Sequence, residues 1–186
     1  AKRHGVTVSL DTNYRSKLWS IDKASRVIGE LMRYTDICIT NPGDIKNLFG
    51  IVSDKADFDL KKPDNEGAAS VAEKLMKKYP LKGAALTLRT NLSASDNDFG
   101  AMLCDGKTAV YSRKYRMHIA DRVGGGDAFA AGLIYSLLKQ KEPQEAVEFA
   151  TAAAVLKHSV EGDFNRVTVS EVESLAGGDG SGRVLR

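Results

Sequence analysis

A glycine-rich loop followed by an acid is the stretch of this sequence whose residue types are best suited to chemistry. Gly124, Gly125 and Gly126 are consecutive, Asp127 follows them, and small and apolar residues continue as far as Leu133. This order is typical of a loop that opens directly into a buried helix. Glycines leave the backbone amides unshielded, and the first turn of a helix adds unpaired N–H groups and the positive end of its dipole. The stretch is therefore predicted to bind an anion.

Asp127 has two interpretations. A carboxylate placed where backbone amides converge would repel a phosphate, so its presence indicates a chemical task, such as taking the proton from an attacking hydroxyl. It could equally be a helix cap beside a flexible turn, because aspartate is a preferred N-cap residue. A dinucleotide-binding turn is disfavoured, since Phe129 stands where the third glycine of G-x-G-x-x-G is required.

The pattern around this loop resembles the C-terminal signature of the PfkB, or ribokinase-like, carbohydrate kinases. The matching positions, nine in a thirteen-residue window, are Asp121, Val123, Gly124 to Asp127 and Ala131 to Leu133. The resemblance implies that Asp127 is the catalytic base and also contacts the substrate. It implies that the amides of Gly124, Gly125 and Gly126 stabilise the transferring phosphoryl group, with Gly124 and Gly126 also binding ATP.

Composition favours a soluble globular protein and excludes several classes. The chain has 186 residues, of which 42% are hydrophobic and 27% charged, and the net charge of +3 comes with only short basic pairs. No nucleic-acid partner is expected. Cys38 and Cys104 lie in apolar runs without metal-ligand spacing, which indicates buried strand residues in a reducing compartment. Without a signal peptide or an apolar run near 18 residues, the protein is expected to be cytoplasmic, with no membrane partner.

Hydrophobic periodicity predicts alternating strands and helices in a single α/β domain over residues 1–186. Strands are expected at 6–10, 36–40 and 84–88, a hairpin at 99–104 and 108–113, and helices at 21–34, 41–50, 66–79, 127–138, 143–156 and after a capping box at Ser170 and Glu173. With the resemblance, this order implies a ribokinase-like three-layer α/β/α sandwich with a mostly parallel sheet and a C-terminal antiparallel hairpin. Ala1 to Gly5 resembles the end of a helix, and the family's kinases are much longer, so a partial fold lacking the N-terminal half and lid is expected.

Asp11, Asn13 and Arg15 alternate just after the first expected strand. Ligands bind at this end of parallel α/β sheets, and alternate residues of an extended segment project to one side. They could converge on one ligand, or they could form a capped loop with a salt bridge. The stretch resembles the D-x-N-x-R and Leu-Trp pattern of 2-keto-3-deoxygluconate kinases within the PfkB family. That resemblance implies that Arg15 reaches both the sugar acid and the phosphate region, with Asn13 among the nucleotide-binding residues.

Asn41 precedes Pro42 and lies nine residues before Gly50, an arrangement that predicts a capped helix. The same position resembles the family's N-x-x-E motif, whose acid organises magnesium and phosphate through water. Asp44 occupies the acid's place and is one methylene shorter. The resemblance therefore implies Asp44 as a water-mediated metal residue in a Mg²⁺-dependent site.

The remaining candidates follow from the resemblance alone. Arg89 to Asp98 is rich in turn-forming residues and is expected to be a long loop between strands. In the family a glycine-containing turn covers the ATP phosphates here, which implies nucleotide contacts by Thr87 and by Arg89, whose guanidinium would replace a glycine amide. Gly162-Asp163 is a turn by itself, but the resemblance places Asp163 beside the sugar and Thr151 beside the nucleotide.

Taken over nearly the whole chain, the resemblance implies the C-terminal half of an ATP-dependent kinase that phosphorylates a sugar acid, 2-keto-3-deoxygluconate, at its 6-position. ATP and Mg²⁺ are the implied cofactors, and the full-length protein is expected to be a homo-oligomer. Two alternatives remain open at this point. One is another PfkB sugar kinase of the ribokinase or fructokinase type, and the other is a catalytically incomplete nucleotide-binding fragment.

Overall fold

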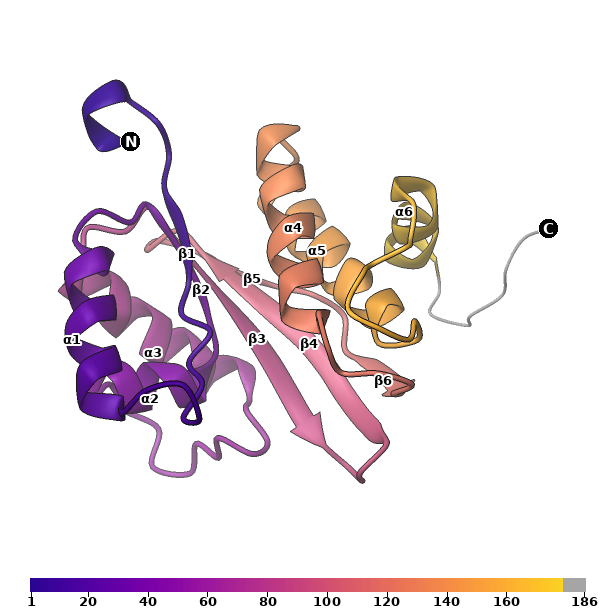
Figure 1. The fold of residues 1–186 in the computed structure, drawn as a ribbon, viewed down its shortest axis with the longest axis horizontal. Coiled ribbons are helices and arrows are strands. Elements are labelled where there is room, and N and C mark those ends of the chain that lie inside the picture. Colours follow the sequence, from indigo (N-terminus) through magenta and orange to yellow (C-terminus); the bar gives the residue numbers. More distant parts are fainter. Residues whose placement is uncertain (179–186) are drawn as a thin grey trace. The chain divides into compact units, whose positions relative to one another are not determined.

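The computed structural model describes residues 1–178 (Figure 1). The chain divides into two compact units. The first unit comprises residues 1–88 and 102–110, and the second comprises residues 89–101 and the chain from residue 111 onward. In the described part, the strands form one mixed sheet in the order β1-β2-β3-β4-β5, and β6 pairs with β4. No helix among the described residues has the length and apolar character needed to cross a membrane.

The first unit contains the parallel strands that were predicted. Its elements are a 3₁₀ helix at Lys2–His4, strands β1 (Ser9–Asp11) and β2 (Ile37–Thr40), most of β3 (Gly83–Asn91), and helices α1 (Ile21–Met32), α2 (Pro42–Phe49) and α3 (Asn65–Lys78). Asp11 of β1 pairs with Ile39 of β2, and Thr40 of β2 pairs with Leu86 of β3. Since all three strands are parallel, the residues that follow β1 and β2 emerge at the same edge of the sheet.

Side-chain caps explain where the helices of this unit begin. Asn41 accepts a hydrogen bond from the Asp44 amide at 2.9 Å, Pro42 is the first residue of α2, and Gly50 ends it with a φ of 67°. Asp64 caps α3 in the same way, through the Gly67 amide at 2.7 Å. These contacts satisfy amides that the first helical turn leaves unpaired. The predicted capping role of Asn41 is confirmed.

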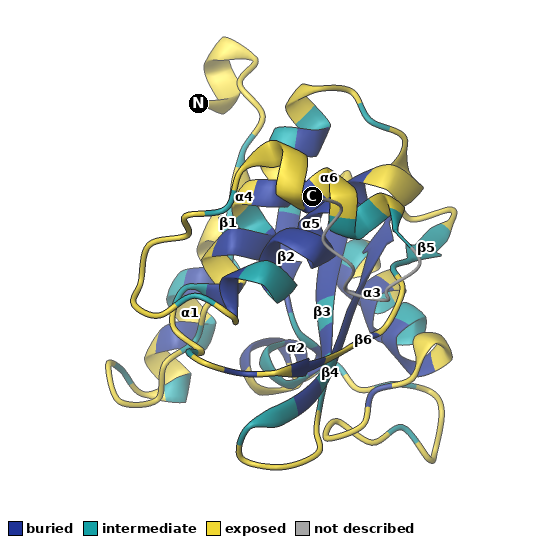
Figure 2. Cartoon of the chain, turned by 90° about the vertical axis from the view of Figure 1, so that its right-hand side faces the viewer, coloured by how far each residue is buried: buried dark blue, intermediate teal, exposed yellow. Residues whose placement is uncertain are grey.

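The second unit is built on two closely packed helices. Its elements are the start of β4 (Asp96–Cys104), the last residue of β5 (Ala109–Tyr111), β6 (Tyr115–His118), α4 (Gly125–Leu138), α5 (Pro143–Lys157) and α6 (Val169–Gly177). Gly132 of α4 lies against Ala150 of α5, where a Cβ on the glycine would be 3.0 Å from the Ala150 Cα. Figure 2 shows α5 buried along most of its length. Small residues therefore allow α4 and α5 to approach closely.

Two local expectations need correction. The segment expected as a long loop over 89–98 is a tight hairpin, since β3 continues to Asn91 and β4 starts at Asp96. The Ser93 hydroxyl accepts hydrogen bonds from the Ser95 and Asp96 amides. Backbone N–H groups of the four-residue turn are therefore paired locally. The final helix is capped by Thr168 and Glu171, two residues earlier than expected. The sequence also predicts a flexible tail over 177–182, which lies outside the described residues from residue 179 onward.

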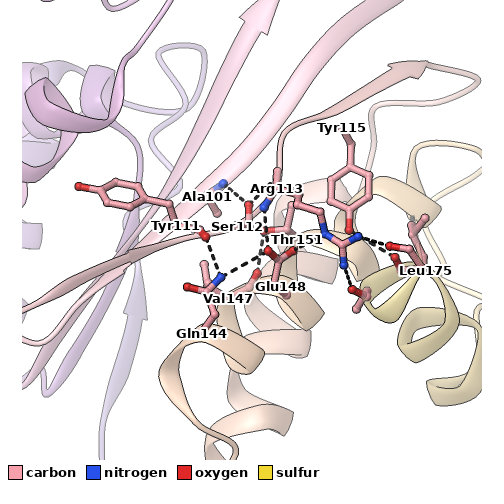
Figure 3. A network of polar contacts seen from close by, with 12 residues as sticks. Ala101, Tyr111, Ser112, Arg113, Tyr115, Gln144, Val147, Glu148, Thr151 and Leu175 are labelled. Atoms are coloured by element: carbon pink, nitrogen blue, oxygen red, sulfur yellow. Dashed lines mark hydrogen bonds and ion pairs between the residues drawn. The ribbon is translucent and has the colours of Figure 1, made fainter. Parts of the chain in front are cut away.

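A polar network fixes α6 within the second unit (Figure 3). The Arg113 guanidinium donates hydrogen bonds to the carbonyls of Ala176 and Gly178, and the Arg113 amide donates to Glu148 at 2.8 Å. Tyr115 donates to the Leu175 carbonyl at 3.5 Å. The carbonyls at the end of a helix carry partial negative charge and lack intrahelical partners, so a guanidinium there both pairs and neutralises them.

We expect Arg113→Ala to lower the free energy of unfolding by about 2 kcal/mol, because two charge-assisted hydrogen bonds are lost and two carbonyls are left unpaired. Urea denaturation measures the change. Arg116→Ala is the matched control, since the ion pair of Arg116 with Asp98 lies at the surface and should contribute less. Equal losses in the two variants would contradict this account of the network.

Candidate active site

The glycine-rich loop forms the N-terminus of α4, as predicted. Gly124 is the N-cap residue, with a φ of 77° that favours glycine, and Asp127 is the third residue of the helix. The helix has no side-chain cap. The alternative interpretation of Asp127 as the N-cap is therefore wrong, and its carboxylate is available for another task.

The Asp127 side chain is exposed, and no hydrogen bond or ion pair involves it within residues 1–178. The Ala128 amide makes the first intrahelical bond, to the Gly124 carbonyl at 2.8 Å, so the amides of Gly126 and Asp127 have no partner inside the helix. A Cβ at Gly126 would meet no atom within 4 Å. The helix start thus presents an unpaired carboxylate and unpaired amides to open space.

The glycine-rich loop lies against the segment that follows α5. Asp121 accepts hydrogen bonds from the amides of Val123 at 3.0 Å and Gly162 at 2.9 Å, and these donors lower the pKa of its carboxyl. A Cβ at Gly124 would lie 2.6 Å from the Asp163 carbonyl oxygen. The structure therefore brings the exposed Asp163, a predicted substrate residue, next to Gly124 at the start of α4.

His158 is a residue of this region that the sequence reasoning missed. Its ring occupies the place of a side chain at Gly125, where a Cβ would be 2.4 Å from the His158 Cε1. Its Nε2 lies 2.8 Å from a terminal nitrogen of Arg89, whose guanidinium also covers the Phe99 ring at 5.5 Å from the centroid. No sequence signal pointed to this contact, because Arg89 and His158 are 69 positions apart.

Thr151 has a geometry that does not favour its expected nucleotide contact. It is completely buried in α5, and its hydroxyl donates to the Val147 carbonyl at 2.7 Å (Figure 3). A hydroxyl that pairs inside its own helix has no free donor for a ligand. The nucleotide contact of Thr151 stays a prediction.

In the first unit, Asp44 connects α2 to the segment after β1. Its Oδ2 accepts hydrogen bonds from the Thr12 hydroxyl at 2.9 Å and the Tyr14 amide at 3.3 Å, and the Thr12 hydroxyl also lies 2.9 Å from that of Thr40. Thr12 and Thr40 are both buried. The Asp44 carboxylate therefore holds the loop that carries Asn13, and its Oδ1 has no hydrogen-bond partner among the described residues.

The other predicted residues of this unit surround that loop. Asn13 is exposed with a φ of 38°, and its amide donates to the Asp11 carboxylate at 3.0 Å. Arg15 is exposed; its guanidinium donates to the Tyr14 carbonyl at 3.1 Å and has no carboxylate partner among the described residues. The Thr87 hydroxyl donates to the Thr40 carbonyl at 3.4 Å. The alternative of a salt bridge to Arg15 is not observed among the described residues, so the charge of Arg15 remains available to a ligand.

The fit of a divalent cation rests on Asp44. No group of three or more acidic, cysteine or histidine side chains among residues 1–178 could hold a metal by itself. Magnesium usually binds through one or two carboxylates, several waters and substrate phosphates. The Asp44 Oδ1 can accept a hydrogen bond from a metal-bound water, so the residues present fit a water-mediated Mg²⁺ contact.

Comparison with known proteins defines the class of this fold and site. Residues 1–168 match the model of the pfkB family carbohydrate kinases. The crystal structure of 2-dehydro-3-deoxygluconokinase from Thermotoga maritima is similar, with 40% identity and a TM-score of 0.88 over 96% of this chain and 53% of that one. A PfkB family carbohydrate kinase from Listeria grayi is 34% identical, with a TM-score of 0.83 over 96% of this chain and 52% of that one.

A curated relative is the 2-dehydro-3-deoxygalactonokinase of Haloferax volcanii, which is 28% identical over 96% of this chain and 50% of its own length. The chain belongs to the pfkB family of carbohydrate kinases and has a ribokinase-like α/β fold. It spans about half the length of the relatives that it matches.

Proposed function

We propose that the protein is an ATP-dependent kinase that phosphorylates a sugar acid, 2-keto-3-deoxygluconate, at its primary hydroxyl. The observation that carries this proposal is the unpaired Asp127 carboxylate among the free amides at the start of α4. The family and the names of its relatives support a sugar kinase, and relatives named for two epimeric 3-deoxy sugar acids favour an acidic substrate.

In the proposed mechanism, Asp127 takes the proton from the sugar hydroxyl as its oxygen forms a bond to the γ-phosphorus of ATP. The bond between that phosphorus and the β,γ-bridging oxygen breaks, so the products are ADP and the phosphorylated sugar acid. The amides at Gly124 to Gly126 donate to the transferring oxygens, each well-placed donor contributing about 3 kcal/mol to transition-state stabilisation. These groups are fixed in place, so little reorganisation is needed at the moment of transfer.

Other residues bind and orient the substrates. Arg15 pairs with the carboxylate of the sugar acid and Asp163 accepts from a sugar hydroxyl, since both are exposed and unpaired with other side chains in the described structure. Asn13, Thr87 and Arg89 contribute to nucleotide binding. Asp44 would hold Mg²⁺ through a water, and the cation would supply charge neutralisation for the phosphates.

The proposal predicts a particular specificity. The full-length kinase should phosphorylate 2-keto-3-deoxygluconate in preference to ribose or fructose. Arg15→Leu should raise the KM for the sugar acid by about 10- to 100-fold, because one hydrogen-bonded charge pair is lost, and should leave weak turnover of neutral sugars unchanged. Steady-state kinetics with each acceptor measures both effects.

Lys17→Leu is the matched control for Arg15→Leu, because it removes an exposed positive charge two residues away. It should change the KM for the sugar acid little. A preference for neutral sugars, or equal effects of the two substitutions, would contradict the sugar-acid assignment.

A further inference from the structure

His158 lies at the meeting point of several segments of the second unit. It is completely buried and directly follows α5, and its Nδ1 is 2.6 Å from the Ala154 carbonyl oxygen. On the other side of the ring, Nε2 is 2.8 Å from Arg89, and the ring edge abuts the backbone of Gly125. One side chain thus contacts the glycine-rich loop and the guanidinium expected to bind phosphate.

The partners of His158 determine its tautomer. A carbonyl oxygen only accepts, so the proton must lie on Nδ1, facing Ala154. A guanidinium only donates, so Nε2 must be unprotonated in order to accept from Arg89. Both ring nitrogens are satisfied only when the imidazole is neutral and carries its proton on Nδ1.

Arg89 is an unusual guanidinium. It is partly buried, it lies over the Phe99 ring, and no carboxylate pairs with it in the described part of the chain. Burial lowers the pKa of Arg89, and the nearby charge of Arg122 lowers it further. Arg122 donates a hydrogen bond to the Ala94 carbonyl at 2.8 Å and likewise has no carboxylate partner among the described residues. Arg89 is half-buried and Arg122 is exposed, and a bound anion such as a phosphate group would compensate their positive charges.

We propose that His158 is a positioning residue whose neutral imidazole fixes Arg89 beside the glycine-rich loop so that the guanidinium meets a phosphate group. The inference rests on the proposed function, because it takes the phosphate group to be that of ATP. Without the acceptor at Nε2, Arg89 would lose the polar contact that orients it and would sample other rotamers. His158 itself touches neither substrate.

Protonation of His158 would turn its acceptor into a donor that faces a cation. Burial is the main cause that lowers its pKa below the ordinary histidine value of 6.5, and the charges of Arg89, Lys157 and Arg122 act in the same direction. The imidazole therefore stays neutral in the folded protein to a lower pH than in the unfolded chain. Its contribution to stability is complete above pH 6.5 and declines as the pH falls from there towards the lowered value. The affinity of the protein for phosphate should also fall as the pH falls, because protonated His158 cannot accept a hydrogen bond from Arg89.

Imidazole ¹⁵N NMR tests the contact independently of catalysis. We expect the full-length protein to show His158 as the Nδ1–H tautomer that remains neutral below pH 6.5, and we expect Arg89→Ala to shift the Nε2 resonance. An Nε2–H tautomer in the unmodified protein would overturn the proposal, because that nitrogen could not accept from Arg89.

A double-mutant cycle tests the positioning role, with the dissociation constant for ATP, measured by calorimetry, as the readout. His158→Leu, which removes both polar atoms, should weaken ATP binding by about tenfold or more, the loss expected for one hydrogen bond to a charged group. It should have almost no effect in the Arg89→Ala background. His158→Gln retains an acceptor oxygen and should restore part of the affinity, and it serves as the test should the leucine variant not fold.

Equal losses from His158→Leu in the two backgrounds would overturn the proposal, since a purely structural role predicts them. Unchanged ATP affinity in Arg89→Ala would overturn it as well. Failure of phosphoryl transfer with intact ATP binding would instead count against the proposed function alone.

Discussion

Asp127→Asn is expected to lower kcat by about 10²- to 10⁴-fold and to leave ATP binding largely intact, because the amide cannot take the proton of the attacking hydroxyl. The side chain is exposed and has no partner within the described residues, so the substitution breaks no contact that the fold needs. Steady-state kinetics and calorimetry of the full-length kinase separate the two effects.

Glu145→Gln is the matched control for that substitution. Glu145 is an exposed acid at the third residue of α5, the same helical position that Asp127 occupies in α4. Both substitutions remove a negative charge from a first helical turn, where it interacts favourably with the helix dipole. Near-normal turnover in Asp127→Asn, or equal losses in the two variants, would refute the assignment of Asp127 as the base.

Gly125→Ala is expected to lower the free energy of unfolding by about 1–3 kcal/mol, the usual range for overpacking a filled site. The new Cβ would lie 2.4 Å from Cε1 and 2.8 Å from Nε2 of His158, which is completely buried. The same displacement should weaken ATP binding through Arg89. Urea denaturation and calorimetry give both quantities.

Gly126→Ala provides the comparison, because a Cβ there meets nothing within 4 Å and alanine favours a helix more than glycine does. Its stability should stay the same or rise. If both alanine variants lost equal stability, the difference between the two glycines would lie in backbone conformation, and the His158 contact would not explain it.

Local patterns allowed much of the fold to be predicted from the sequence. The start and end of α2 follow from the backbone preferences of Asn41, Pro42 and Gly50. The helix that these residues predicted begins and ends at the expected positions. The Gly-rich start of α4 followed in the same way from Gly124 to Gly126. Such features depend on neighbours a few positions away, so a single sequence contains all of the information needed.

The errors arose where local patterns were ambiguous or contacts were distant. Turn-forming residues over 89–98 suggested a long loop, but cross-strand pairing extended both strands and left a short turn. Thr168 and Ser170 can both cap a helix, and each is followed three residues later by a glutamate, so the sequence pattern does not decide between them. His158 was overlooked because its role depends on Arg89 and Gly125, and the fold alone brings these residues together.

The most direct test of the account is a crystal structure of the full-length kinase with 2-keto-3-deoxygluconate and a non-hydrolysable ATP analogue. We expect the primary hydroxyl of the sugar acid to lie within hydrogen-bond distance, about 2.6–3.2 Å, of the Asp127 carboxylate. We also expect the γ-phosphate to meet the amides of Gly124 to Gly126. A sugar hydroxyl bound out of reach of Asp127, with another side chain in contact with its proton, would contradict the central claim.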